Sequence, residues 1–210
     1  MMNKDAELIN IDENLDFAVD KAEKIYLGGN VFIYPTDTIY GFGANPFNEE
    51  AIARINTIKG REEGKSYIFL IDGIESLLKY IELDSEHHID FLHSIWPNPV
   101  SVVLKLNKKT ATVLNQETAA FRVPNHRFCQ KLLKKLKMPL VSTSVNRSSH
   151  PPVIEPVIIK EQFSSEVDAI FFSEKKSFIE ASTIINLIDS APKLLREGKI
   201  KFADLLSKFN

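Results

Sequence analysis

Two threonines and two glycines lie just beyond an apolar run near the start of the chain. Residues 31–34 read Val-Phe-Ile-Tyr, which predicts a buried strand, and Thr36, Thr38, Gly41 and Gly43 follow it. Loops at strand ends are where open sheets bind ligands, and glycine lets a ligand come close to the backbone. A turn that simply requires glycine explains the same residues, so ligand binding and turn formation are both open.

Three cations, Lys59, Arg61 and Lys65, lie between a predicted helix and the next apolar run. Such a group can hold a polyphosphate, because arginine offers a two-pronged guanidinium and lysine a point charge. Cations also gather at helix C-termini, where they offset the helix dipole, and Glu62 and Glu63 could pair with them locally. A phosphate site and a solvated helix end are therefore alternatives.

Two arginines lie at predicted strands. Arg122 is flanked by Phe121 and Val123 in a short apolar run. An arginine there is rarely buried without a partner, so we expect it to bind either a ligand carboxylate or phosphate, or a distant Asp or Glu. Arg196 precedes Glu197 at the end of a later strand, and it could be a second phosphate ligand or part of a surface ion pair.

Hydroxyl and amide side chains end another apolar run. Residues 140–146 read Leu-Val-Ser-Thr-Ser-Val-Asn, which places Ser142, Ser144 and Asn146 at the end of a predicted strand. Hydroxyls and amides in such a place can bind phosphate oxygens or a small polar ligand. They can equally bond to the local backbone where the chain enters a loop.

One helix carries two features to which we assign mainly structural roles. Cys129 lies among its apolar positions, which favours a core residue over a nucleophile. Lysines recur on the same helix at 131, 134, 135 and 137. Such a basic face is usually solvated, and the alternative is contact with an RNA backbone.

The elements that must position these residues alternate irregularly along the chain. Apolar spacing predicts helices over residues 11–27, 48–58, 74–81, 85–95, 125–136 and 202–208, and strands over 31–34, 67–71, 100–106, 120–123, 140–144, 169–172, 183–187 and 193–196. Some strands follow one another directly, which indicates a mixed sheet flanked by helices, α/β or α+β in class. The long loop at 146–156 is a candidate functional loop.

Length and composition limit the class of protein. The 210 residues predict one domain over residues 1–210. Apolar residues make up 44% and charged residues 26%, which excludes disordered and fibrous classes. The net charge of −2 implies no general attraction to nucleic acid. With one cysteine and no apolar run near the roughly 20 residues that span a bilayer, we expect a cytoplasmic protein without a membrane partner.

Six short motifs occur in one order along the chain. They are PTDTIYG at residues 35–41, KGR at 59–61, WPNP at 96–99, FRVP at 121–124, SVN at 144–146 and STI at 182–184. In these motifs the chain resembles the YrdC family, the threonylcarbamoyl-AMP synthases also called TsaC, over residues 17–196. The K-x-R pattern followed much later by S-x-N is the most specific part of the resemblance.

The resemblance implies a fold and an activity. The fold would be α/β, with a twisted, largely parallel sheet around a positively charged concave pocket. Family members condense L-threonine, bicarbonate and ATP to threonylcarbamoyl-AMP and pyrophosphate, helped by Mg²⁺. Downstream transferase proteins then use this product to modify an adenosine of certain tRNAs, so tRNA or double-stranded RNA is a further expected partner.

The family's functional residues carry over onto matching positions of this chain. By resemblance, the catalytic residues would be Lys59, Arg61, Ser144 and Asn146. ATP would contact Arg61, Lys65, Thr118, Ser144 and Arg196. Threonine would contact Thr38, Arg122, Ser142 and Ser182, with its carboxylate on Arg122. No residue is assigned to a metal.

The chain departs from the family pattern in two places. Glu62 and Glu63 make the K-x-R segment unusually acidic, and Pro152 stands where some members have a nucleotide-contacting serine. The chain also resembles the YciO branch near Arg196. The alternatives to synthase activity are therefore a YciO-like protein, a YrdC-like RNA-binding protein, or a related carbamoyl-adenylate chemistry as in hydrogenase maturation proteins.

Overall fold

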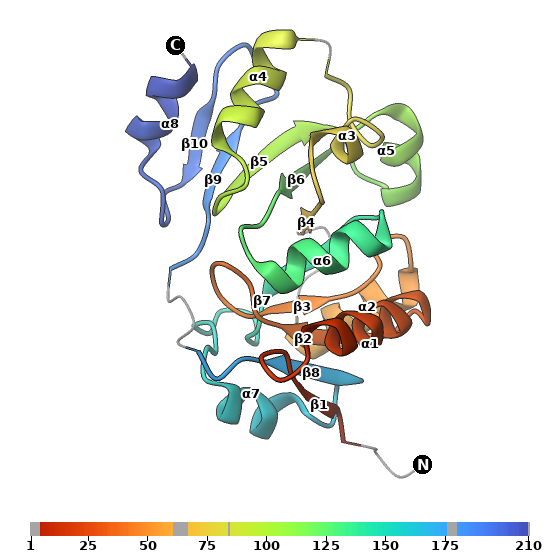
Figure 1. Cartoon of the computed structure of the whole chain (residues 1–210). Helices are drawn as coiled ribbons and strands as arrows, with labels where there is room; N and C mark the ends of the chain where they lie inside the picture. Colours follow the sequence, from red (N-terminus) through yellow and green to blue (C-terminus); the bar gives the residue numbers. More distant parts are fainter. Residues whose placement is uncertain (1–4, 61–66, 84, 176–179, 210) are drawn as a thin grey trace.

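A single mixed sheet forms the centre of the molecule (Figure 1). The computed structural model describes residues 5–60, 67–83, 85–175 and 180–209. The strands are β1 (Glu7–Asn10), β2 (Phe32–Tyr34), β3 (Gly41–Gly43), β4 (Ile68–Leu70), β5 (Val100–Lys105), β6 (Thr118–Arg122), β7 (Leu140–Ser144), β8 (Ala169–Phe172), β9 (Thr183–Asn186) and β10 (Lys193–Arg196). Their order across the sheet is β1-β8-β2-β3-β7-β4-β6-β5-β9-β10.

The pairing of these strands confirms the mixed sheet and corrects one expectation. β1 with β8, β2 with β8, β4 with β6 and β5 with β9 are parallel. β2 with β3, β3 with β7, β4 with β7, β5 with β6 and β9 with β10 are antiparallel. The expected largely parallel sheet is therefore wrong for the described part of the chain. Short connections such as that between β2 and β3 return the chain directly, and such connections can join only antiparallel neighbours.

Helices connect and cover the strands. They are α1 (Leu15–Leu27), α2 (Glu49–Lys59), α3 (Ile74–Leu77), α4 (Glu86–Ile95), α5 (Lys108–Leu114), α6 (Arg127–Leu136), α7 (Pro156–Phe163) and α8 (Phe202–Phe209). Several begin where the sequence offers a capping side chain: Asn14, Asn48, Ser85 and Asn107 each accept a backbone N–H of the first turn. None of the described helices is both long and apolar enough to cross a bilayer.

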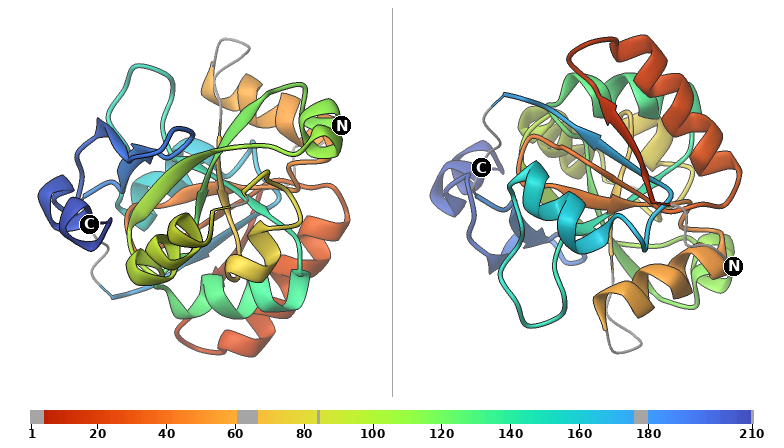
Figure 2. Two further views of the ribbon diagram at one scale, coloured as in Figure 1. Left: turned by 90° about the horizontal axis from the view of Figure 1, so that it is seen from above. Right: turned by 90° about the horizontal axis from the view of Figure 1, so that it is seen from below.

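Two apolar clusters hold the helices against opposite faces of the sheet (Figure 2). Successive side chains of β2 point to opposite faces of the sheet and so belong to different clusters. Phe32 and Tyr34 pack in the cluster of α1 and α6, and Ile33 packs in that of α2 and α7. Phe128 on α6 and Phe163 on α7 are fully buried in these two clusters. Cys129 is also fully buried beside Phe128, which confirms its expected core position.

Four elements are missing from the sequence-based expectation. β1 and β3 are short strands, and β3 reads Gly-Phe-Gly, so neither has a strong local signal; their partners in the sheet define them. Helix α5 is mostly uncovered by the rest of the protein, so its sequence shows little of the apolar periodicity that predicts a helix. Helix α7 starts at Pro156, inside the predicted loop, because proline is favoured in the first helical turn. The helix expected over 74–81 is shorter, and α3 ends at Leu77.

Candidate functional site

The register of three neighbouring strands builds the floor of a cavity. Leu70 of β4 pairs with Arg122 of β6 and with Leu140 of β7, so these side chains share one face of the sheet. In the next row on that face, Ile68 pairs with Ser142. The cluster of α1 and α6 covers Leu70 and Leu140, and Ile68 packs at its margin. Ile68, Ser142 and Arg122 line a cavity of about 360 Å³.

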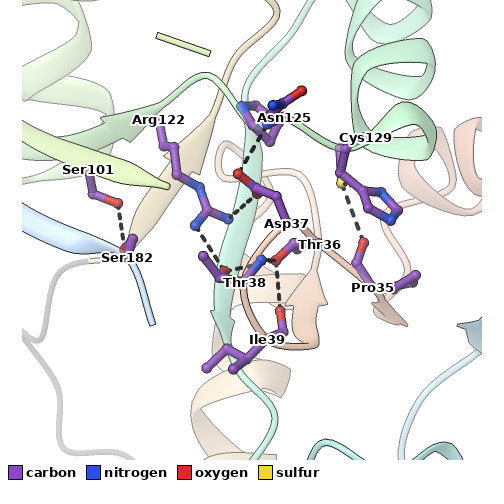
Figure 3. A network of polar contacts seen from close by, with 12 residues as sticks. Pro35, Thr36, Asp37, Thr38, Ile39, Ser101, Arg122, Asn125, Cys129 and Ser182 are labelled. Atoms are coloured by element: carbon purple, nitrogen blue, oxygen red, sulfur yellow. Dashed lines mark hydrogen bonds and ion pairs between the residues drawn. The ribbon is translucent and has the colours of Figure 1, made fainter. Parts of the chain in front are cut away.

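A buried arginine, Arg122, lines this cavity, and its side chain points toward Asp37 and Thr38 (Figure 3). Arg122 is 2% exposed, and one Nη atom donates to the hydroxyl of Thr38 at 3.0 Å. Its other Nη atom lies 3.6 Å from Oδ1 of Asp37. Oδ2 of Asp37 accepts the backbone N–H of Asn125 at 3.1 Å. Nε of Arg122 and Oδ1 of Asp37 make no hydrogen bond within the described chain, so this ion pair is loosely matched.

Neighbouring hydrogen bonds fix which atom the Thr38 hydroxyl donates its hydrogen to. Thr36 donates to the carbonyl of Ile39 at 2.8 Å, and the two threonine hydroxyls lie 2.9 Å apart. Each hydroxyl has a single hydrogen, so Thr38 must be the donor to Thr36. Because Thr38 also accepts from Arg122, its remaining lone pair can only accept a further hydrogen bond. The cavity therefore presents an acceptor here, beside a guanidinium.

A second arginine, Arg196 on β10, also lines the cavity. Arg196 donates through Nη2 to the carbonyl of Ser182 at 2.8 Å, and the hydroxyls of Ser182 and Ser101 lie 3.0 Å apart. Burial, together with the charge of Arg122, lowers the pKa of Arg196. Arg196 makes no ion pair with the described residues, and its role, as a phosphate ligand or in a surface ion pair, stays a prediction.

A glycine shapes the chain beside Arg196. A Cβ at Gly198 would lie 2.3 Å from the carbonyl oxygen of Ala181, closer than any side chain allows. The backbone N–H of Lys199 also donates to that carbonyl at 3.0 Å. The segment after β10 therefore packs directly on the backbone that carries Ser182.

A lysine organises the end of β7. The side chain of Lys59 is buried at the end of α2, and its ammonium donates to the carbonyl of Ser144 at 2.5 Å and to Oδ1 of Asn146 at 2.7 Å. Ser144 also donates to Oδ1 of Asn146 at 2.6 Å. These contacts join the ends of the K-x-R and S-x-N motifs. Ser144 lines the cavity, whereas Lys59 and Asn146 support it from behind.

The structure brings together most of the residues expected at the site. Thr38, Arg122, Ser142, Ser144, Ser182 and Arg196 all line the one cavity. Thr118 does not line it, although alternation along β6 places its side chain on the same sheet face as Arg122. Arg61 and Lys65, together with Glu62 and Glu63, lie outside the described residues. The roles of all these residues stay predictions.

Sequence reasoning assigned no role to Asp37 or Ser101. Asp37 is the distant acid that the alternative interpretation of Arg122 required. A carboxylate directly after a buried strand was the available signal. Ser101 is fully buried in a strand that is otherwise mostly apolar, and a hydroxyl in that setting needs a partner, here Ser182.

Two of the four lysines on the basic face of α6 are paired with acids. Lys131 pairs with Asp16, and Lys135 lies 2.9 Å from Glu23 and pairs also with Asp20. All three acids belong to α1, which packs beside α6 (Figure 1). This pairing favours the solvated helix face over an RNA contact.

Comparison with known proteins identifies the family. The family model described as Telomere recombination, for the Sua5, YciO and YrdC proteins, matches residues 24–198. The chain belongs to the Sua5/YciO/YrdC family. A threonylcarbamoyl-AMP synthase of Pseudoalteromonas atlantica is 33% identical to this family member over 147 residues, which is 68% of this chain and 78% of that protein.

Solved structures of the family share the fold. The crystal structure of P. abyssi Sua5 complexed with L-threonine superposes with a TM-score of 0.87 at 25% identity, covering 98% of this chain and 61% of that one. E. coli YciO superposes with a TM-score of 0.82 at 25% identity, covering 95% and 98%. This family member therefore spans about three fifths of the Sua5 chain and nearly all of YciO.

Proposed function

We propose that this protein is an L-threonylcarbamoyladenylate synthase, which condenses L-threonine, bicarbonate and ATP to threonylcarbamoyl-AMP and pyrophosphate. The buried guanidinium of Arg122 carries the proposal. It lies on a cavity wall, its Nε has no partner among the described residues, and its ion pair to Asp37 is loose. An unpaired buried donor is costly unless a ligand satisfies it. The P. abyssi Sua5 structure that contains L-threonine supports a carboxylate as that ligand.

Threonine fits the groups around Arg122. Its carboxylate would accept from the guanidinium, as charge-assisted pairs favour. Its amino group would donate to the oriented hydroxyl of Thr38, which can only accept. The side chains of Ser142 and Ser182 also line the cavity and would contact the rest of the amino acid.

The nucleotide would occupy the remaining polar part of the same sheet face. Arg196 and Ser144 line the cavity, and Arg61 and Lys65 are expected to add phosphate contacts. Thr118 lies four residues from Arg122 on β6, about 13 Å along the strand at roughly 3.3 Å per residue. An elongated site with threonine near Arg122 and the nucleotide reaching toward Thr118 would accommodate both substrates.

The reaction requires positioning more than a reactive side chain. The threonine nitrogen and bicarbonate would form a carbamate with loss of water, and a carbamate oxygen would displace pyrophosphate from the α-phosphorus of ATP. Fixed cations would stabilise the charge on the phosphates as that bond breaks. Of the described residues that line the cavity none is Asp or Glu, so Mg²⁺ would arrive on the ATP phosphates rather than on protein carboxylates.

The activity would serve tRNA modification. Threonylcarbamoyl-AMP carries an activated carbonyl, so downstream transferase proteins would move the threonylcarbamoyl group to a tRNA adenosine. That role would place the protein in the cytoplasm.

Pyrophosphate release tests the proposal directly. Purified protein with ATP, Mg²⁺ and bicarbonate should release pyrophosphate when L-threonine is added, and much less with L-serine. The Arg122→Ala variant should lose this response, while Arg127→Ala, an exposed arginine outside the cavity, should keep it. ATP binding without threonine-dependent release would instead support a YciO-like protein, and the absence of both would refute the synthase.

A further inference from the structure

A second hollow lies apart from the proposed active site. It has a volume of about 380 Å³, within the range of small-molecule sites, and shares no described lining residue with the first cavity. Phe47 comes from the loop between β3 and α2, Tyr80 follows α3, and Lys109 and Val113 lie on α5. Helices α3 and α5 lie side by side in this region (Figure 1).

Aromatic rings form one wall of the hollow. Phe47 and Tyr80 are stacked, with ring centroids 6.0 Å apart and planes 28° from parallel. Both side chains are half-buried rather than enclosed in the core. Val113 is 55% exposed beside them, so the hollow leaves apolar surface in contact with solvent. A flat, partly apolar ligand would cover such a wall.

Two lysine side chains line the same hollow. Lys79 and Lys109 line it, and neither makes an ion pair with the described residues. None of the described lining residues is acidic. Lys105 and Lys135, in contrast, are paired: Lys105 with Glu82 at 2.7 Å, and Lys135 with acids of α1. Uncompensated lysines beside aromatic rings indicate a ligand that joins a planar group to an anion.

One asparagine fixes the parts of this hollow in place. The side chain of Asn107 donates to the carbonyl of Lys79 at 2.9 Å and accepts the backbone N–H of Thr110 at 2.9 Å. Its own N–H donates to the carbonyl of Tyr80 at 3.0 Å. The turn after α3 is thereby tied to the start of α5. The backbone segments that carry Lys79, Tyr80 and Lys109 are held together before any ligand binds, which lowers the entropy cost of binding.

We propose that this hollow binds a nucleotide unit, with its base against Phe47 and Tyr80 and its phosphate against Lys79 and Lys109. A base has a flat π-face whatever its identity, and stacking on aromatic side chains is a common way to bind one. A free phosphate would leave the rings uncovered, and an apolar ring alone would leave the lysines unused. The nucleotide unit could belong to a free mononucleotide or to unpaired RNA, and the experiment separates these two sources.

Charge reversal is the first test. A fluorescently labelled ten-nucleotide single-stranded RNA of mixed sequence is titrated with protein at several salt concentrations. The double variant Lys79→Glu/Lys109→Glu should bind at least about tenfold more weakly and lower the salt slope by about 0.7, the value for the one phosphate that the two lysines would hold. The matched control Lys24→Glu/Lys160→Glu reverses the same amount of charge at two exposed lysines that make no ion pair with the described residues, and its affinity should stay within about twofold.

Ring removal is the second test. Tyr80→Leu should weaken binding at least about fivefold, because stacking contributes about 1–3 kcal/mol per base, while Tyr80→Phe keeps the ring and should bind normally. Phe47→Leu gives an independent readout if Tyr80→Leu unfolds. A loss on charge reversal with no effect from either ring would indicate simple charge attraction and overturn the proposal.

Calorimetry with AMP shows whether the bound nucleotide unit is a free mononucleotide or part of an RNA strand. If AMP binding weakens in Lys79→Glu/Lys109→Glu, a free nucleotide occupies the hollow; if only RNA binding weakens, the ligand is a strand. If neither probe distinguishes this variant from its control, the proposal is wrong. Threonine-dependent pyrophosphate release should be unchanged in the double variant, so this proposal and the proposed synthase activity can fail separately.

Discussion

Arg122 and Arg147 are both paired with a carboxylate, yet their surroundings differ completely. Both carboxylate oxygens of Glu166 accept from Arg147, at 2.5 and 2.7 Å, and Arg147 also donates to the carbonyl of Ile58. Arg122, in contrast, lies 3.6 Å from Asp37, and its Nε has no hydrogen-bond partner in the part of the chain that the structure describes. The well-matched arginine is 42% exposed in its side chain, and the poorly matched one is 3% exposed.

This difference separates a structural arginine from one available to a ligand. Water can satisfy any unmet donor of Arg147, so its pairing with Glu166 serves to anchor the 146–156 loop beside Phe163, whose ring lies 4.8 Å from the guanidinium. A buried donor without a partner costs about 1–3 kcal/mol. The fold therefore keeps Arg122 in an unfavourable state that a bound anion would relieve, which is expected of a binding site.

The largest effect should follow removal of the buried cation. Arg122→Met leaves the carboxylate of Asp37 buried without its partner, so the free energy of unfolding should fall by about 3–5 kcal/mol in urea titrations. The double variant Arg122→Met/Asp37→Asn removes both charges and should recover much of that loss without recovering threonine-dependent activity. Equal stabilities for the single and double variants would show that Asp37 does not depend on Arg122.

Removal of the lysine behind the cavity should have the next largest effect. Lys59→Met leaves the oxygens of Ser144 and Asn146 without their shared donor, which should lower the free energy of unfolding by about 1–3 kcal/mol. Because Ser144 would shift, kcat/KM for ATP should also fall. Thermal unfolding and pyrophosphate release check the two effects. Unchanged stability with lost activity would instead place Lys59 on the substrate.

Replacement of Arg147, the structural arginine, should destabilise the protein less than replacement of Arg122. Arg147→Met removes an ion pair that is more than one third exposed, so solvent screening limits the expected loss to about 0.5–1 kcal/mol. Pyrophosphate release at saturating substrates should stay near that of the unchanged protein. A drop in activity comparable to that of Arg122→Ala would contradict the division between the two arginines.

The residues that line the cavity could be predicted from the sequence better than the residues that hold them in place. Ser142, Ser144 and Arg122 lie in or at the ends of apolar runs, so strand alternation and polar chemistry point to them locally. Asp37 supports Arg122 from 85 residues away in the chain, and no local pattern reveals such a pairing. The burial of the Lys59 ammonium depends likewise on a loop far along the chain.

The same reason explains the errors in the fold. Strands β1 and β3 exist because β8 and β7 pair with them, and their own residues carry weak strand signals. The long apolar run of β5 could be recognised because a buried strand requires such composition wherever it pairs. Local patterns thus predicted most strands, including the edge strand β10, while long-range pairing decided the edge strand β1, the interior strand β3 and the direction of the strands.

The smallest expected effect concerns His126, which lies beside Asp37 and Arg122. Burial lowers the pKa of its imidazole below the ordinary 6.5, and the charge of Arg122 acts in the same direction, against Asp37 and Asp12. The neutral form is therefore favoured in the folded state. Its stabilising contribution is complete above pH 6.5 and is lost as the pH falls from there through the folded-state pKa.

The variant His126→Gln cannot bind this proton. Urea titrations at pH 7 and pH 5 should therefore show a smaller loss of stability on acidification in the variant than in the unchanged protein. Lys24→Gln, a distant surface change of the same small size, should retain the full pH dependence. Parallel losses in all three proteins would mean that His126 accepts its proton without cost, and that the surroundings of Arg122 are open to water. The buried arginine would then be no less solvated than Arg147, which would remove the basis of the comparison.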